Sequence, residues 1–210
     1  MKHRYFLGLA AVALLAITVT PVLVQGRVKD TVHNLNGNPA ITVTNDEVCR
    51  PCHTPHFAST EVHYLWNHEL TTATFTVFAG ATSADVESSS SRLCLSCHDG
   101  TVALDSYGGG TGTQFVGADG FLGIDLTDDH PIGVDYPPAG THGFNDVDPV
   151  TGHIVDPVET PVGSYASLED GKVQCVSCHY AHGSRAPYGM FLKIDNTGSA
   201  LCMTCHIAPG

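Results

Sequence analysis

The chain has 210 residues, with 21 acidic side chains against 9 Lys or Arg side chains and a formal net charge of −12. This charge disfavours nucleic acid as a partner, because the phosphate backbone attracts basic surfaces. Glycine (22 residues) and proline (12 residues) are frequent. Long amphipathic periods are scarce, so we expect a mostly irregular, coil-rich fold with a few short helices and minimal β-structure.

The first 26 residues have the pattern of an export signal. Lys2 and Arg4 supply positive charge, residues 6–24 carry none, and Val24-Gln25-Gly26 offers small residues for cleavage. We predict a signal peptide at 1–26 and a mature domain at 27–210, with a retained membrane anchor as the alternative. An exported protein meets an oxidising compartment, where disulfides are the default use of eight cysteines.

Short elements are predicted along the first half of the mature chain. Residues 27–48 form an N-terminal arm with one short strand at 41–44, and this arm is a candidate interaction segment. A helix is expected over 61–72, a weakly alternating strand over 74–79, and a Ser-rich linker over 83–91.

The segment from residue 108 to residue 161 is rich in Gly, Asp and Pro. Such a segment seldom builds an apolar core, and we expect it to wrap around the faces of a cofactor. Its acidic groups, Asp128-Asp129 and Asp146 with Asp148, could hold a divalent cation, but they lack EF-hand spacing and favour turns. A C-terminal unit follows at 172–210.

Four CxxCH motifs use every cysteine of the chain, at 49–53, 94–98, 175–179 and 202–206. Covalent c-type haem attachment requires this spacing, because two sulfurs bond to the haem and the next histidine lies under the iron. A disulfide framework would not place a histidine after every second cysteine, and zinc bound by cysteine pairs would leave the four histidines without a role. We therefore predict four covalent haems (haem c), attached through Cys49, Cys52, Cys94, Cys97, Cys175, Cys178, Cys202 and Cys205, with proximal iron ligands His53, His98, His179 and His206. The C-terminal unit at 172–210 then carries a pair of haems.

The ligand on the other, distal face of each iron determines what the haem can do. Met190 is the only methionine outside the signal and the motifs. Eight histidines remain in the mature chain, twice the number that four irons need: His33, His56, His63, His68, His130, His142, His153 and His182. Histidine is therefore the expected distal ligand.

His56 and His182 each follow a proximal histidine by three residues, in the pattern CxxCHxxH. A residue at this spacing stays on the proximal side of its own haem. If either is a ligand, it must bind the iron of a neighbouring haem and so bring two haems together. The alternative is a role close to a haem propionate.

Two other histidines have a favourable local context. His68 lies in the predicted helix beside Trp66, which can pack on a haem ring. His130 precedes Pro131, which favours an extended backbone that holds the imidazole outward. Three more stand in loops with weaker context and are reserves, for which a surface role is expected: His33, His142 and His153.

Five strings together resemble the doubled-CxxCH multihaem c-type cytochromes: CHTPH at 52–56, LWNHE at 65–69, SRLCLSCHDGTVALD at 91–105, DLTDDHPIGVDYP at 125–137 and CVSCHYAHGS…LCMTCH at 175–206. Within that group the chain is most similar to tetrahaem extracellular cytochromes that polymerise into filaments. The resemblance implies a fold organised around a covalent haem stack and bis-histidine ligation of every haem, with the distal ligands His56, His68, His130 and His182. It also implies that His56 binds a haem of the next subunit. Tyr180-Ala181 departs from the Asp-Pro that is common in the third motif, but the histidine spacing is intact.

These features predict a secreted electron-transfer protein, not an enzyme, located outside the cell or at its surface. The expected partners are further copies of itself, other multihaem cytochromes and an extracellular electron acceptor. The alternatives are a monomeric periplasmic electron shuttle and a small multihaem reductase. A reductase needs an open or weakly ligated iron.

Overall fold

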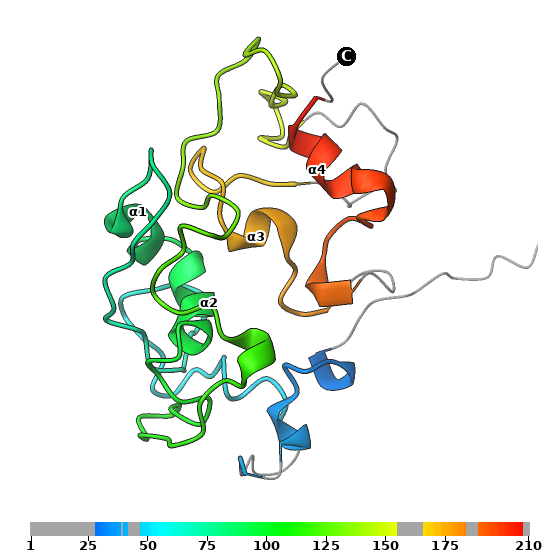
Figure 1. The fold of residues 1–210 in the computed structure, drawn as a ribbon. Helices are drawn as coiled ribbons and strands as arrows, with labels where there is room; N and C mark the ends of the chain where they lie inside the picture. Colours follow the sequence, from blue (N-terminus) through cyan, green and yellow to red (C-terminus); the bar gives the residue numbers. More distant parts are fainter. Residues whose placement is uncertain (1–27, 39, 42–46, 155–165, 184–188, 208–210) are drawn as a thin grey trace, which may run out of the picture.

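The computed structural model describes residues 28–38, 40–41, 47–154, 166–183 and 189–207 (Figure 1). The predicted signal at 1–26 lies outside these residues, as does the predicted strand at 41–44 apart from Ile41. Within the described ranges, no helix has the length and apolar character needed to cross a membrane.

Short helices are separated by long irregular segments. The α-helices of the described chain are α1 (Ser83–Glu87), α2 (Ser91–His98), α3 (Cys175–Cys178) and α4 (Ala200–Cys205). Single 3-10 turns occur at η1 (Val28–Asp30), η2 (Leu35–Gly37), η4 (Ala118–Gly120), η5 (Gly189–Phe191) and η6 (Thr197–Ser199). The same residues form isolated β-bridges and no strand. The predicted coil-rich fold is therefore confirmed.

The predicted helix at 61–72 is wrong. This segment folds back on the first motif instead: Thr54 N donates to Leu65 O at 3.0 Å, and Asn67 N donates to Cys52 O at 2.8 Å. The turn requires left-handed backbone at Tyr64 (φ 69°) and Leu65 (φ 54°), which no α-helix contains. Helix propensity is a weak preference, and here pairing with the motif backbone outweighs it.

The predicted strand at 74–79 is reduced to isolated parallel bridges, one between Thr76 and Asp125 and one between Ala79 and Ala81. Thr76 N donates to Ile124 O at 2.9 Å, and Leu126 N donates to Thr76 O at 2.8 Å. The alternating pattern thus identified an extended segment, but its partner continues for too few residues to make a sheet.

The predicted linker at 83–91 is also wrong, because it forms α1 and the start of α2. The carboxylate of Asp85 accepts a hydrogen bond from Thr82 N at 2.8 Å and so satisfies a donor at the start of α1. The hydroxyl of Ser88 donates to Ala84 O at 2.7 Å, and that of Ser89 to Val86 O at 2.8 Å. The serine hydroxyls therefore donate hydrogen bonds to carbonyls at the end of the helix, and the segment is not a flexible linker.

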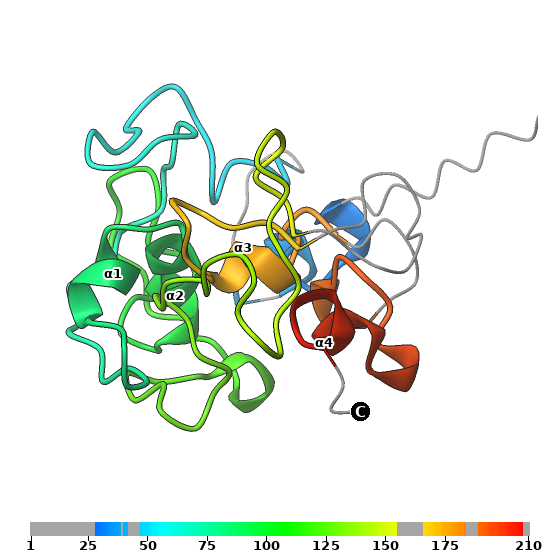
Figure 2. The same cartoon turned by 90° about the horizontal axis from the view of Figure 1, so that it is seen from above.

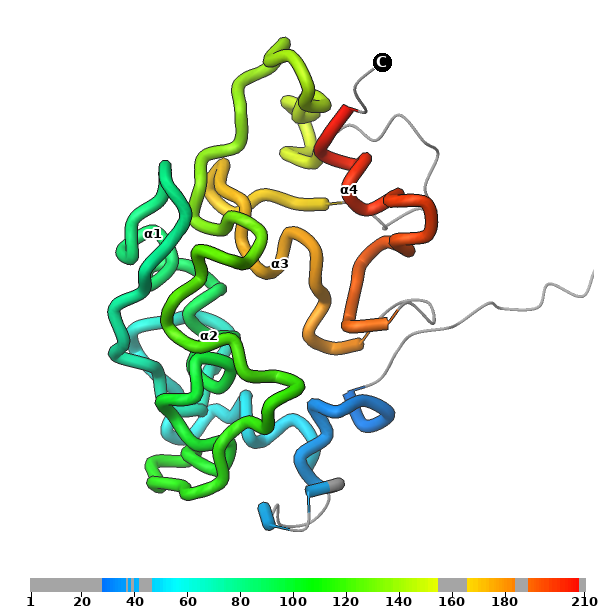
Figure 3. Tube along the Cα trace, viewed as in Figure 1, coloured from blue at the N-terminus to red at the C-terminus, as the bar shows by residue number. Residues whose placement is uncertain are grey.

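A small apolar core lies where α1 and α2 meet the segments at 73–77 and 124–132 (Figure 2). It consists of Phe75, Val86, Leu95 and Leu126, with Ala73, Val77 and Ile132 packed against it. The C-terminal unit, with α3 and α4, lies beside this core (Figure 1). The trace in Figure 3 shows the N-terminal arm near the C-terminal unit. The His33 ring stacks on Phe191 of η5.

Candidate functional site

Each CxxCH motif forms one helical turn. The second, third and fourth motifs lie at the ends of α2, α3 and α4. In the first motif, His53 N donates to Cys49 O at 2.8 Å, and the same bond joins His206 N to Cys202 O at 2.9 Å. Such a turn carries both sulfurs of a motif on one side, as attachment to one edge of a haem requires. All eight thiols are free.

A buried polar network joins the second motif to the third. The Ser91 hydroxyl donates to Gln174 Oε1 at 2.7 Å and accepts from Cys175 N at 3.0 Å. Gln174 Nε2 in turn donates to Asp85 O at 3.1 Å. Ser91 and Gln174 are almost fully buried, so these bonds fix how α3 lies against α2.

Thiols of neighbouring motifs also influence one another's pKa. A hydrogen bond to the Cys175 thiol, together with burial, raises the pKa of Cys94. Burial raises the pKa of Cys97 to about 12, and the nearby Cys52 thiol adds to this effect. Burial likewise raises the pKa of Cys205 to about 11, with a contribution from Cys178. Thiols of successive motifs therefore lie close enough to influence one another's pKa, the first with the second, the second with the third and the third with the fourth.

Three of the four motif histidines are held in one tautomer. Their Nδ1 atoms lie within hydrogen-bonding distance of backbone carbonyls, His53 at 2.8 Å from Tyr64 O, His98 at 2.6 Å from Gly120 O and His179 at 2.7 Å from Met190 O. A carbonyl can only accept, so Nδ1 carries the proton and the lone pair is on Nε2. The fourth ring, His206, packs on Phe144 with ring centres 4.9 Å apart. A hydrogen bond from Nδ1 to a carbonyl, as in the first three motifs, fixes the orientation of an imidazole that binds a metal through Nε2.

Three motif histidines each have the ring of another histidine close by, and each such couple is called a facing pair. The ring centres are 6.0 Å apart for His53 and His182, 6.2 Å for His98 and His33, and 6.3 Å for His206 and His130. Two imidazoles that share one metal through bonds of about 2 Å have ring centres about 6 Å apart. Every histidine from His33 onward is described, and each facing pair joins one CxxCH histidine to one histidine outside these motifs.

His182 lies opposite His53 of the first motif and not opposite its own His179. This is the placement that the CxxCHxxH spacing requires of a ligand. His130 lies opposite His206, so the structure brings two of the four predicted distal histidines to motif imidazoles.

His33 is the residue that sequence reasoning undervalued. Its Nδ1 lies 3.0 Å from Ala181 O, 148 residues along the chain, and its ring stacks on Phe191 at 4.3 Å and 20°. Burial lowers the pKa of His33, which favours the neutral imidazole. No local pattern reveals these partners, because both belong to the C-terminal unit.

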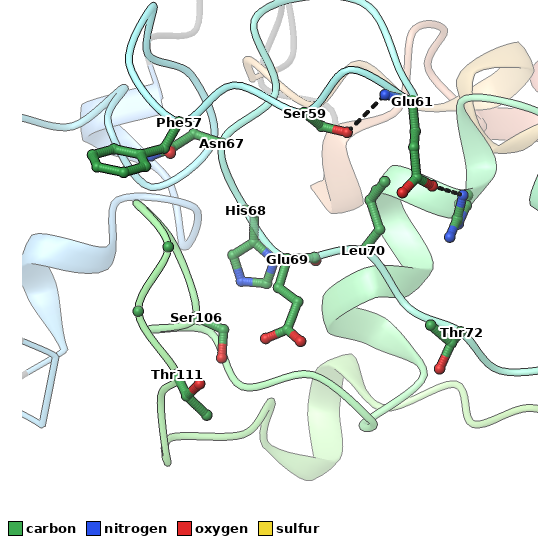
Figure 4. Close-up of a pocket in the computed structure, with 13 residues that line it drawn as sticks. Phe57, Ser59, Glu61, Asn67, His68, Glu69, Leu70, Thr72, Ser106 and Thr111 are labelled. Atoms are coloured by element: carbon green, nitrogen blue, oxygen red, sulfur yellow. Dashed lines mark hydrogen bonds and ion pairs between the residues drawn. The ribbon is translucent and has the colours of Figure 1, made fainter.

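His68 is buried, but it does not face a motif imidazole in the described structure. Its Nε2 lies 3.0 Å from Ala103 O and 3.6 Å from Cys97 Sγ, and its Nδ1 lies 2.8 Å from Glu69 O. The ring borders an open, largely polar pocket of about 420 Å³ (Figure 4). His68 thus lies beside a sulfur of the second motif.

His56 and His179 are left without a facing histidine among the described residues. His56 is exposed, and its backbone N–H is bonded to Thr54 Oγ1 at 3.2 Å. The His179 ring is exposed as well.

The segment at 49–67 and the described residues of the segment at 175–193, which are 175–183 and 189–193, share several backbone features. In both, the motif histidine bonds through Nδ1 to a carbonyl 11 residues later. In both, it is bridged to the residue two positions further, His53 to Trp66 and His179 to Leu192. Left-handed residues precede this bridge in each case, Tyr64 with Leu65 and Met190 with Phe191. His56 and His182 therefore occupy equivalent positions in two copies of one structural unit, which the sequence shows only through its CxxCHxxH spacing.

The other metal interpretations find no support in the described part of the chain. There, no group of three or more His, Cys, Asp or Glu side chains converges on a position for a metal ion. The carboxylate of Asp148 accepts from Val150 N at 2.7 Å and Thr151 N at 3.0 Å, which is the turn-forming role.

Residues 167–209 match the doubled CXXCH motif family. No curated protein matches the chain. Doubled CXXCH motifs indicate a multihaem c-type cytochrome, so haem c is the implied cofactor. The paired thiols, the Nδ1-bonded imidazoles and the facing histidines are the donor set that such haems require.

Proposed function

We propose that this chain is an exported tetrahaem cytochrome that carries electrons and assembles into an extracellular filament. A haem iron held by two imidazoles exchanges one electron and binds no substrate at the metal. The observation that carries the electron-transfer proposal is the set of three facing imidazole pairs, centred 6.0 to 6.3 Å apart.

The ligand assignment follows from these pairs. His53, His98, His179 and His206 are the proximal ligands. His182 serves the first motif, His33 the second and His130 the fourth, so His33 takes the place that the resemblance gave to His68. The mutual influence of thiols in successive motifs on their pKa values supports haems that lie near one another along the chain.

Filament assembly follows from the repeated unit. His182 belongs to the C-terminal repeat, at 175–193, and its ring lies close to the His53 imidazole of the N-terminal repeat, at 49–67. The equivalent histidine of the N-terminal copy is His56, which is exposed, and the equivalent imidazole is His179, which has no facing histidine in the described chain. Because His56 cannot serve its own motif, we assign it to His179 of a neighbouring copy. Each subunit then both gives and receives one ligand, and the chain of contacts continues without closing.

The variant His56→Ala tests this assembly. We expect haem content to be retained and filaments to be lost, because the ligand between subunits is removed. Negative-stain microscopy measures filament length, and the absorption spectrum measures haem content. The control is His63→Ala, which removes another exposed histidine of the same segment. Filaments of normal length in His56→Ala would exclude the trans ligand.

A reductase is the second candidate, and the exposed His179 imidazole is the observation that favours it. An iron at this motif without a trans ligand would be open to a small substrate. Carbon monoxide separates the two functions. Reduced filaments should bind little of it, whereas a stoichiometric CO-binding site in the assembled protein would favour the enzyme.

The cellular setting of the proposal rests on the N-terminal pattern. A cleaved segment at 1–26 would deliver the chain to the extracellular space or the cell surface, where other multihaem cytochromes and an extracellular acceptor are the expected partners. If the protein stays monomeric after export, a periplasmic shuttle is the better description. Size-exclusion chromatography of the secreted protein distinguishes the two.

A further inference from the structure

The Trp66 indole is buried without a partner for its N–H. The residue is only 9 % exposed, and Nε1 is the one buried side-chain nitrogen or oxygen in the described residues that makes no hydrogen bond. Indole nitrogen can donate but not accept, so a hydrogen-bond acceptor must come from outside the described residues. A buried donor left unpaired costs free energy, and native proteins rarely leave one.

The indole lies beside the imidazole of the first motif. Trp66 is bridged directly to His53 in an antiparallel arrangement, which places the two side chains on the same face of the paired segments. The two ring centres are 6.0 Å apart and the ring planes are nearly perpendicular, at 81°. Any group bound through Cys49, Cys52 and His53 therefore has Trp66 at its border.

We propose that Trp66 Nε1–H donates a hydrogen bond to a propionate carboxylate of the haem attached at the first motif. The propionates are the anionic groups that haem c brings to this site, and a hydrogen bond from N–H to an ionised carboxylate is stronger than one to a neutral acceptor. The inference rests on haem attachment at Cys49 and Cys52 and is independent of filament assembly.

The equivalent position in the second copy of the unit lacks this donor. Leu192 is bridged to His179 as Trp66 is to His53, and its side chain is apolar. The first motif therefore has a side-chain hydrogen-bond donor at this position, and the third motif does not. Because the N–H partly offsets the negative charge of the propionate, it disfavours the ferric state, so the haem at the first motif should have a higher reduction potential than it would without Trp66.

The variant Trp66→Phe tests the proposal in the haem-loaded protein, because it keeps an aromatic ring and removes the donor. We expect unchanged haem content, a lower potential for one haem, and a shift of one propionate carboxylate band in infrared spectra of isotope-labelled haem. The control is Leu192→Met, which alters packing at the equivalent position and should move neither the carboxylate band nor that potential. Retained haem with an unshifted band and unchanged potential would overturn the proposal while leaving the cytochrome function intact.

A measurement on the unaltered protein decides the question if Trp66→Phe fails to load haem. Trp66 is the only tryptophan of the chain, so its signals need no assignment. Ultraviolet resonance Raman spectra of the holoprotein should show a strongly hydrogen-bonded indole N–H. A free indole N–H would overturn the proposal.

Discussion

The assignment of His33 to the second motif makes the sharpest prediction, because sequence reasoning favoured His68. The variant His33→Ala removes the imidazole that faces His98 at 6.2 Å. The iron at this motif should lose its sixth ligand and become high-spin, while the other low-spin signals remain. His33→Met should restore a low-spin iron with a raised potential, because a thioether replaces the imidazole.

The loss in docking free energy of the N-terminal arm can be worked out from the two contacts of His33 with the C-terminal unit. Stacking on Phe191 contributes about 0.5 to 1.5 kcal/mol, and the hydrogen bond to Ala181 O about 0.5 to 1.5 kcal/mol. Their loss weakens docking of the N-terminal arm by about 1 to 3 kcal/mol, which raises its open population about 5- to 150-fold, in addition to the lost iron bond.

Electron paramagnetic resonance of the oxidised protein counts high-spin iron, and hydrogen exchange reports docking of residues 28–38. The control is His142→Ala, because His142 is an exposed histidine that faces no motif imidazole. An unaltered low-spin spectrum in His33→Ala would exclude His33 as an iron ligand, and an arm that exchanges at the original rate would exclude its role in docking residues 28–38.

Three further predictions concern contacts made by other residues. His68→Ala should keep every iron low-spin but lower the denaturation midpoint, because a buried, hydrogen-bonded ring is lost; a new high-spin signal would return His68 to the ligand set. Ser91→Ala should lower the free energy of unfolding by about 1 to 3 kcal/mol in denaturant titrations, because Cys175 N loses its acceptor and Gln174 its donor; an unchanged midpoint would exclude this network as a structural tie. Hydrogen bonds from Thr82 and the ion pair with Lys172 hold the pKa of Asp85 below its ordinary value. The stability that the ionised Asp85 carboxylate contributes is therefore complete above the pKa of this carboxyl in the unfolded chain and is lost as pH falls through its pKa in the folded protein. Asp85→Asn should make the free energy of unfolding depend less on pH in the acid range. An identical pH profile in the variant would contradict this.

Much of the candidate site could be predicted from the sequence, because covalent haem attachment imposes a local spacing. The cysteines and proximal histidines stand in CxxCH motifs, and the three-residue offset of His182 forces it toward another motif. The same constraint identifies His56 as a residue for a different site. These predictions need only short-range geometry, which residue order determines directly.

The missing parts depend on contacts that residue order does not reveal. His33 is positioned by Phe191 and Ala181, both distant in the sequence. Residues 61–72 have helical composition but pair with the backbone of the first motif. In the Ser-rich segment before α2, Asp85 and the serine hydroxyls make hydrogen bonds to backbone groups at the ends of a helix. The features shared by 49–67 and the described residues of 175–193 are not evident in the sequence, because Trp66 and Leu192 differ in chemistry although each is bridged to a motif histidine.

A density map of the haem-loaded, assembled protein that resolves the iron ligands would show the proposed ligand set itself. We expect His182 on the iron of the first motif, His33 on that of the second and His130 on that of the fourth, with His56 of a neighbouring subunit on that of the third. A map with His68 on any iron and His33 free, or with His182 away from the first motif, would contradict it.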